Sequence, residues 1–252
     1  MSWFTVFLSF LLCASAANAQ VDIESRRLDG GASHTGEIEI DFTLRGGNVD
    51  LVEFGPTVSV NFTRGRNTFL VIGSGNLGWE NGERFANEFL GHLRWVLLWK
   101  SRIQPEAFVQ ANYDKSRKLD IRTLAGGGLR VRLGRNDRGA LWAGSAYMIE
   151  HEENEVALTN AHPASTSVSR WANYFSASAV LSSTAEWSAI VYVQPDMVDF
   201  SDVRVLVETG LEVKVTETVS LDTYLSIHHD ADPVDGIAET DYALKSALKL
   251  KW

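Results

Sequence analysis

The stretch TDYALKSALKLKW at residues 240–252 decides the fold, because apolar and charged residues alternate along almost all of it. One parity carries Tyr242, Leu244, Leu248, Leu250 and Trp252, and the other carries Asp241, Lys245, Lys249 and Lys251. Successive side chains of a β-strand point to opposite faces, and lipid solvates only the apolar face. The lysines must therefore face a wet lumen or its rim. This pattern is typical of the closing strand of an outer-membrane barrel.

Similar segments recur from about residue 36 onward and are separated by turn residues. In the clearest of them, Val203, Val205 and Val207 alternate with Arg204 and Glu208. The predicted strands are 36–44, 50–62, 68–79, 84–99, 103–115, 119–133, 140–151, 168–182, 187–194, 202–215, 219–229 and 240–252. An even number, about twelve, suits a barrel with both termini in the periplasm. We predict an all-β fold, a transmembrane antiparallel up-and-down β-barrel.

The connections between these strands alternate between short and long. The short ones would be periplasmic turns, and the longest, 152–167 and 230–239, would be extracellular loops. Tryptophans near the strand ends suit an interfacial aromatic belt, namely Trp95, Trp99, Trp142, Trp171, Trp187 and Trp252.

The N-terminus carries the only long apolar run, from Trp3 to Ala17. Ala17 and Ala19 form a small-x-small cleavage site before Gln20, so residues 1–19 are predicted to be a signal peptide. Residues 20–35 show little pattern and are predicted to be a flexible periplasmic lead-in. Residues 36–252 would form the barrel, integral in the outer membrane of a Gram-negative bacterium.

The composition argues against several other classes of protein and of site. Cleavage after Ala19 would remove Cys13, the single cysteine, and with it any disulfide or thiolate metal site. No second apolar run reaches the length of roughly 20 residues that a spanning helix requires. The net charge of −9 argues against nucleic acid as a partner. No cofactor is expected.

Several motifs together resemble one family. They are GN at 47–48, RFANE at 84–88, YDK at 113–115, RKLDIRTL at 117–124, GGGLR at 126–130, QP at 194–195 and DFSD at 199–202. In this order they are similar to the YdiY-like family of salt-induced outer-membrane proteins, from about residue 36 to residue 252. The loop at 151–167 and the final Trp, where Phe is usual, depart from that pattern. The resemblance implies a barrel and supplies no catalytic residues.

The inward parity collects a network of charged residues in the predicted lumen. Its members are Glu88, Arg94, Glu106, Asp114, Asp120, Arg122, Arg130, Arg132, Asp202, Arg204, Glu208, Lys245 and Lys249. Buried charges need partners, so we expect Glu88 to pair with Arg94 and Arg122. We likewise expect Arg204 to pair with Glu208.

In the predicted topology, the sign of the charges in this network changes along the lumen. Arg130, Arg132 and Lys249 approach the periplasmic end, while Asp114 and Asp202 lie toward the outer rim together with Asp120. Such a gradient would suit a channel for small anions or zwitterions. The alternative is that opposite charges pair and plug the lumen, which we favour because about twelve strands enclose a narrow interior.

A catalytic or metal site has weaker support. His228, His229 and Asp230 are the only cluster of the right types for a hydrolase at the outer rim, but alternation sends the two histidines to opposite faces. No serine stands in a G-x-S-x-G motif. A metal site formed by these residues and Asp232 is disfavoured for the same reason, because the two histidines point to opposite faces of the strand. Neither an enzyme nor a metal site is therefore predicted.

Two other motifs have simple structural interpretations. The simplest interpretation of the polar segment His151, Glu152 and Glu153 is a run of charges exposed to water. The three glycines at 126–128 lie inside a strand with no helix after them, so they predict a close-packed or sharply curved wall rather than a phosphate cradle.

The last strand also predicts partners. Tyr242, Leu248, Leu250 and Trp252 resemble the signal by which the outer-membrane assembly machinery recognises a closing strand. Outer-membrane lipid, lipopolysaccharide and periplasmic chaperones during transit complete the expected set. We predict a structural or stress-responsive barrel with a narrow charged lumen; the rivals are a small-solute channel and a rim hydrolase.

Overall fold

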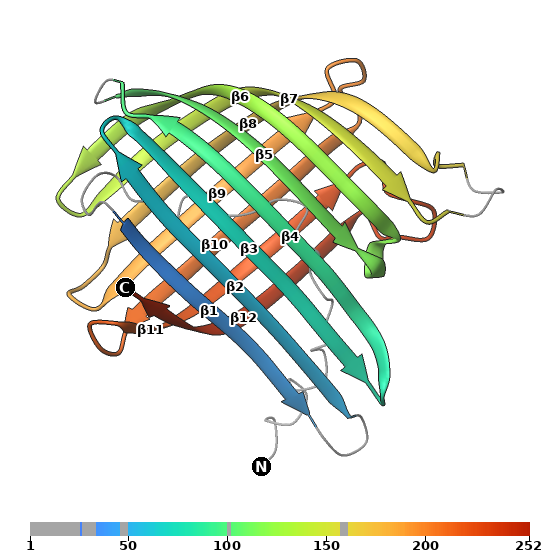
Figure 1. The fold of residues 1–252 in the computed structure, drawn as a ribbon, viewed down its shortest axis with the longest axis horizontal. Coiled ribbons are helices and arrows are strands. Elements are labelled where there is room, and N and C mark those ends of the chain that lie inside the picture. The colour runs from blue at the N-terminus through green and yellow to red at the C-terminus, as the bar shows by residue number, and fades with distance from the viewer. Residues whose placement is uncertain (1–25, 27–33, 46–49, 100–101, 157–160) are drawn as a thin grey trace, which may run out of the picture.

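A closed barrel of twelve antiparallel strands forms the molecule (Figure 1). The computed structural model describes residues 26, 34–45, 50–99, 102–156 and 161–252. The strands are β1 (His34–Arg45), β2 (Leu51–Arg64), β3 (Asn67–Glu80), β4 (Glu83–Leu97), β5 (Ile103–Asp114), β6 (Leu119–Asn136), β7 (Gly139–Asn154), β8 (Ser165–Val180), β9 (Ala185–Pro195), β10 (Val203–Lys214), β11 (Val219–Asp230) and β12 (Thr240–Lys251). The all-β class and the strand number are confirmed. The signal peptide and nearly all of the lead-in lie outside the described residues.

Each strand pairs with the next along the chain, and β1 pairs with β12 to close the sheet. The closing register is short, from Glu37 opposite Lys251 to Asp41 opposite Ala247. The β1–β2 register, in contrast, runs along all of β1. Gly36 and Trp252 complete the seam, since each backbone N–H donates to the other residue's carbonyl, at 3.1 and 3.0 Å.

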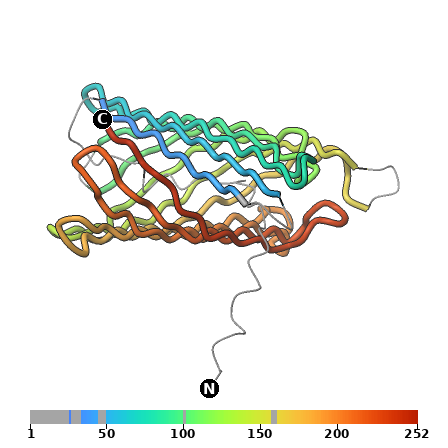
Figure 2. Tube along the Cα trace, turned by 90° about the horizontal axis from the view of Figure 1, so that it is seen from below, coloured from blue at the N-terminus to red at the C-terminus, as the bar shows by residue number. Residues whose placement is uncertain are grey.

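The long β7–β8, β9–β10 and β11–β12 connections lie at one end of the barrel, together with the tight turn at Asn81–Gly82 between β3 and β4 (Figure 2). We call the end with His34 and Lys251 the inner end, and the other the outer end. At the outer end, a 3₁₀ turn at Lys115–Arg117 links β5 to β6. β7 and β8 reach further outward than predicted, to Asn154 and from Ser165.

The outer surface of the wall is apolar, as the alternation requires. On β12, Tyr242, Leu248, Leu250 and Trp252 are 41–65% exposed, while Ala243, Ala247 and Lys249 face inward and are buried. Trp142 departs from the predicted aromatic belt, because it is only 3% exposed and lies inside the lumen. Its even position places it on the inward face of β7, a parity that the belt interpretation ignored.

Glycines on the inward face let the wall pack closely. A Cβ added to Gly128 would lie 2.1 Å from the carbonyl oxygen of Ser145, and one on Gly126 would lie 2.5 Å from the Phe108 ring. On the neighbouring strand, a Cβ on Gly144 would lie 2.0 Å from the Tyr174 ring. The predicted close-packed wall at residues 126–128 is confirmed.

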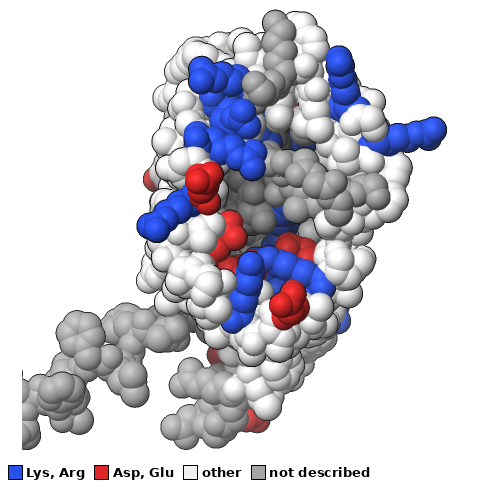
Figure 3. Space-filling model, turned by 90° about the vertical axis from the view of Figure 1, so that its left-hand side faces the viewer, with Lys and Arg blue, Asp and Glu red and all other residues white. Residues whose placement is uncertain are grey.

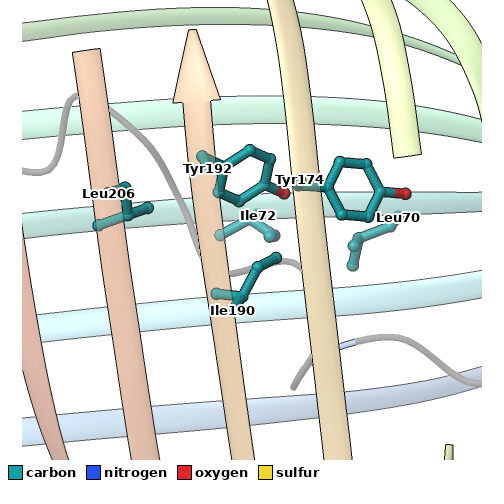
Figure 4. Packing of buried hydrophobic residues seen from close by; sticks show 6 residues of the cluster. All are labelled: Leu70, Ile72, Tyr174, Ile190, Tyr192 and Leu206. Carbon is teal, nitrogen blue, oxygen red and sulfur yellow. The ribbon is translucent and has the colours of Figure 1, made fainter. Parts of the chain in front are cut away.

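A cluster of buried apolar residues crosses the waist of the lumen (Figure 4). Leu70 and Ile72 of β3 pack with residues of β8, β9 and β10, namely Tyr174, Ile190, Tyr192 and Leu206. β3 and β9 are six strands apart in either direction around the barrel, so these contacts join opposite walls. We call these six residues the waist cluster. Phe108, Leu124, Ala146, Met148 and Ala172 form a second buried cluster.

Candidate functional site

A network of buried charges fills the outer part of the lumen. We call it the outer network; its members are Arg122, Glu150, Glu152, Arg170, Asp202, Arg204 and Asp230. Arg204 lies at its centre, with Nη1 2.5 Å from Glu150 and 2.6 Å from Glu152. Its Nε donates to Asp230 at 3.1 Å.

Strand register assembles this network. Arg122 lies opposite Glu152 across β6–β7 and forms an ion pair with it, and Arg204 lies opposite Asp230 across β10–β11. Arg170 contributes two further ion pairs, to Glu150 at 2.9 Å and Asp202 at 3.0 Å. Three arginines thus face four carboxylates. Each buried charge has at least one partner of opposite sign, which is what makes its removal from water tolerable.

Below the outer network, a polar pair adjoins the waist. Arg94 Nη1 lies 3.1 Å from Glu106 Oε2, and the Arg94 guanidinium lies 4.5 Å from the centre of the Phe108 ring. The hydroxyl of Tyr174, a waist residue, donates to Glu106 Oε1 at 3.1 Å. A buried ion pair and an apolar cluster therefore share one cross-section of the lumen.

The inner end of the lumen has charges of both signs. Arg26, from the predicted lead-in, lies against the wall, with its guanidinium 2.5 Å from Glu37 and 2.8 Å from Glu39. Lys249 lies 2.6 Å from Asp222 and 3.6 Å from Glu39. These contacts place one residue of the lead-in inside the barrel.

A cavity of about 310 Å³ opens at this inner end. Its lining includes Arg130, Lys249, Lys251, Glu212 and Asp222. Figure 3 shows lysine and arginine gathered around a hollow at the end that carries the C-terminus, with fewer acidic side chains between them. Inside, the Arg130 guanidinium stacks 3.7 Å from the Trp142 ring centre, and that of Arg132 lies 5.6 Å from it.

The structure contradicts the predicted place of Asp120. A β-bulge between Leu119 and Ile121 shifts the register of β6, and Asp120 points outward. It forms an ion pair with the exposed Lys115. Strict alternation fails at a bulge because the extra residue has no partner opposite it, so the parity count gave the wrong face.

The predicted ion pairs are also wrong. Arg94 pairs with Glu106, and Arg122 with Glu150 and Glu152, so neither pairs with Glu88. Arg204 binds Glu150, Glu152 and Asp230, whereas Glu208 lies opposite Ser226 on the next strand. Residues four or six apart on one strand are separated by roughly 13 to 20 Å, so the partners come from other strands, either neighbouring ones or, for Arg204 of β10 with Glu150 and Glu152 of β7, strands across the lumen.

The charge gradient is not present as predicted. The outer network contains three arginines, and the inner end contains the carboxylates of Glu37, Glu39, Glu212 and Asp222. Asp114, Glu88 and Lys245 instead line a separate small cavity. The prediction omitted Glu150, Glu152 and Arg170, although their even positions share the inward parity. Glu152 was predicted to be solvated together with His151 and Glu153, but it is only 4% exposed.

The two candidate catalytic histidines lie on opposite faces of β11. His228 is buried, and its Nε2 lies 2.8 Å from Ser226 Oγ inside the lumen. His229 faces outward and its Nδ1 lies 2.9 Å from Thr240 Oγ1. Within the described ranges, no carboxylate forms an ion pair with His228, and Ser226 is 2% exposed. The pair therefore lacks both an orienting acid and access for a substrate.

In the described part of the chain, no group of three or more His, Cys, Asp and Glu side chains is placed to hold a metal ion. None of the described helical segments is long and apolar enough to cross a membrane.

Solved structures with the same architecture are outer-membrane barrels. The NanC porin matches with a TM-score of 0.51 and 7% identity, over 85% of this chain and 97% of that one. The translocator domain of the autotransporter NalP from Neisseria meningitidis matches with a TM-score of 0.47 and 13% identity, over 91% of both chains. At these identities the likeness shows the fold alone. The chain shares the closed antiparallel β-barrel fold of these proteins.

Sequence comparison identifies the family. None of the curated proteins matches the chain. A family model described as "Protein of unknown function, DUF481" matches residues 38–252, nearly the whole predicted barrel. This match is consistent with the YdiY-like resemblance. The protein therefore belongs to the DUF481 family.

Proposed function

We propose that this protein is a structural barrel of the bacterial outer membrane whose lumen is closed by its own side chains. The waist cluster carries the proposal, because it joins β3 to β8–β10 and contains residues exposed by at most 7%. Tightly packed apolar side chains exclude water, and ions do not cross a dry constriction. The barrel would then act as a scaffold in the envelope rather than as a diffusion pore.

The outer end supports the same proposal. The connection between β11 and β12 lies against the other outer segments: Lys118 Nζ donates to the carbonyl of Asp235 at 2.8 Å, and Ala161 N–H donates to the Asp235 carboxylate at 2.6 Å. Val234 of the same connection is 7% exposed. The outer network lies beneath it. A solute entering from outside would have to displace both layers.

Planar-bilayer recording tests the closed lumen. The wild-type protein is expected to give no conductance steps, because the waist cluster joins opposite walls of the lumen. The double variant Tyr174→Ala, Ile72→Ala removes a ring and a branched side chain from opposite walls, and it should give reproducible steps. Tyr147→Ala is the matched control, because Tyr147 lies on the exterior and is 49% exposed; it should stay silent.

A small-solute channel is the second candidate, favoured by the cavity at the inner end. Arg130 and Lys249 line that cavity, and cationic side chains attract small anions. Steps in the wild-type recordings would contradict the closed scaffold. If their anion preference also reversed in the variant Arg130→Glu, Lys249→Glu, the channel would replace the scaffold as the conclusion.

We propose that the mature chain reaches the outer membrane through periplasmic chaperones and the barrel assembly machinery, and then contacts lipid and lipopolysaccharide. Trp252 supports this proposal, because its ring lies against Gly36 at the seam, where an added Cβ would be 2.3 Å away. Trp252→Ser is expected to lower the assembled fraction in cells several-fold, as measured by heat-modifiable gel migration of outer-membrane samples.

Leu244→Ser is the control for Trp252→Ser, because Leu244 lies on the same outward face of β12 and is 66% exposed. If both substitutions reduced assembly equally, Trp252 would matter only as an apolar surface. A stress-responsive role rests on the family resemblance alone. Unchanged growth of a deletion strain in high salt would contradict that role.

A further inference from the structure

A row of polar side chains crosses six neighbouring strands in the outer half of the lumen. From β12 through β1 to β5 its members are Lys245, Asp41, Glu53, Asn76, Glu88 and Asp114. Asn76 lies directly opposite Glu88, and Glu88 directly opposite Asp114. We call this set the acidic row. Four carboxylates share one lysine.

The lysine compensates only one end of the acidic row. Lys245 Nζ lies 3.6 Å from Asp41 and 3.6 Å from Glu53. Neither Glu88 nor Asp114 forms an ion pair with a lysine or arginine of the described chain. Like charges directly opposite each other on neighbouring strands repel. The Glu88 and Asp114 end therefore has no cation in direct contact, although Lys245 and Arg117 act on it from further away.

Two buried oxygen atoms at this end have no hydrogen-bond donor. They are Oδ1 of Asn76, a residue 2% exposed, and Oδ2 of Asp114, a residue 3% exposed. The Asn76 amide nitrogen donates to Glu53 at 2.9 Å, and Glu88 also accepts from the Asn76 side chain, so that only the amide oxygen is without a partner. Asp114 Oδ1 accepts from Ser116 N–H and Oγ at 2.9 and 2.6 Å, so only Oδ2 is available.

Both residues line one cavity of about 40 Å³, together with Glu88, Tyr113 and Tyr224. Asp114 also lines a second cavity, which is bordered by Asp232 and Val234 of the outer β11–β12 connection. The first cavity has room for an ion with a few water molecules, and the second lies between it and the outer end.

We propose that this cavity binds Ca²⁺ through Asp114 Oδ2, Asn76 Oδ1 and the Glu88 carboxylate. Ca²⁺ takes six to eight oxygen ligands from carboxylates, amide carbonyls and water, in flexible geometry. Two carboxylates match its double charge. Because the described residues offer no converging set of three acidic or imidazole groups, the ion keeps several of its waters. Soft transition metals, which prefer sulfur and imidazole, find no such ligands in the cavity.

The test uses Tb³⁺, a luminescent substitute for Ca²⁺, and the mature chain refolded into detergent without lipopolysaccharide. Excitation of Tyr113 and Tyr224 should give saturable Tb³⁺ emission that Ca²⁺ displaces. Ca²⁺ should also raise the Tm of the wild-type barrel. Asp114→Asn and Glu88→Gln should each weaken Ca²⁺ binding at least tenfold. Asn76→Asp should strengthen it several-fold, because it adds a charged ligand.

Asp120→Asn is the matched control, because Asp120 lies on the same stretch of the chain but faces outward. It should bind Ca²⁺ like the wild type. The proposal is overturned if the wild type shows no saturable binding up to the millimolar range of extracellular calcium modules. It is equally overturned if folded Glu88→Gln, which leaves the Asp114–Ser116 contacts intact, binds Ca²⁺ as tightly as the wild type.

Discussion

Replacing Arg204 with leucine is expected to lower the free energy of unfolding of the barrel by about 3 to 5 kcal/mol. Arg204 binds Glu150, Glu152 and Asp230 at 2.5 to 3.1 Å, and all of these side chains are at least 86% buried. Leucine would fill part of the volume but leave the carboxylates with too few partners. Leaving a buried charge without its partner destabilises a protein by far more than the intact ion pair stabilises it.

Urea unfolding in lipid vesicles, followed by tryptophan fluorescence, measures this loss. Arg138→Leu is the control, because Arg138 is exposed at the turn between β6 and β7 and should change the free energy by less than about 1 kcal/mol. A similarly small change for Arg204→Leu would show that the outer network contributes little to stability. Adding Asp230→Asn to Arg204→Leu should recover part of the loss, because Asp230 forms its ion pair with Arg204, whereas Glu150 and Glu152 also bind Arg122.

The substitution Gly128→Ala is expected to destabilise the barrel by about 1 to 3 kcal/mol, although it adds a single methyl group. That methyl would lie 2.1 Å from the Ser145 carbonyl oxygen and 2.5 Å from the Ala146 Cα. Both atoms belong to the backbone of β7, so the wall itself must shift. The same unfolding measurement applies.

The adjacent substitution Gly127→Ala is the matched control for this prediction. Gly127 faces outward, and a Cβ there would meet its nearest atom, the Glu106 carbonyl oxygen, at 3.5 Å. This variant should be as stable as the wild type. Equal stability of the two alanine variants would mean that close packing across β6–β7 does not constrain the barrel.

The fold could be predicted from the sequence because contact with lipid requires every second residue of each strand to be apolar. Tyr242, Leu248 and Trp252 follow that rule, and β12 lies where the alternation predicted. Only the strand ends were inexact: β7 continues to Asn154 because Glu152 and Asn154 are inward residues of the strand rather than loop residues.

The interior was less predictable, for reasons of register. Parity assigns a side chain to the lumen but says nothing about its height, so it cannot tell that Arg122 meets Glu152 and not Glu88. A single bulge was enough to send Asp120 outside. Trp142 looked like a belt residue by composition, yet it stacks on Arg130 in the lumen. These features depend on the register between strands and on contacts across the lumen, which the alternation of apolar and polar residues does not encode.

The waist cluster has a kinetic consequence. Ile72 and Ile190 come from strands far apart in the chain, on opposite walls, and they meet only once the sheet has closed. Contacts of such large sequence separation form late and are weak in the transition state for folding. Their loss should leave the rate of insertion almost unchanged and accelerate unfolding. The packed waist thus determines how long an assembled molecule survives in the membrane.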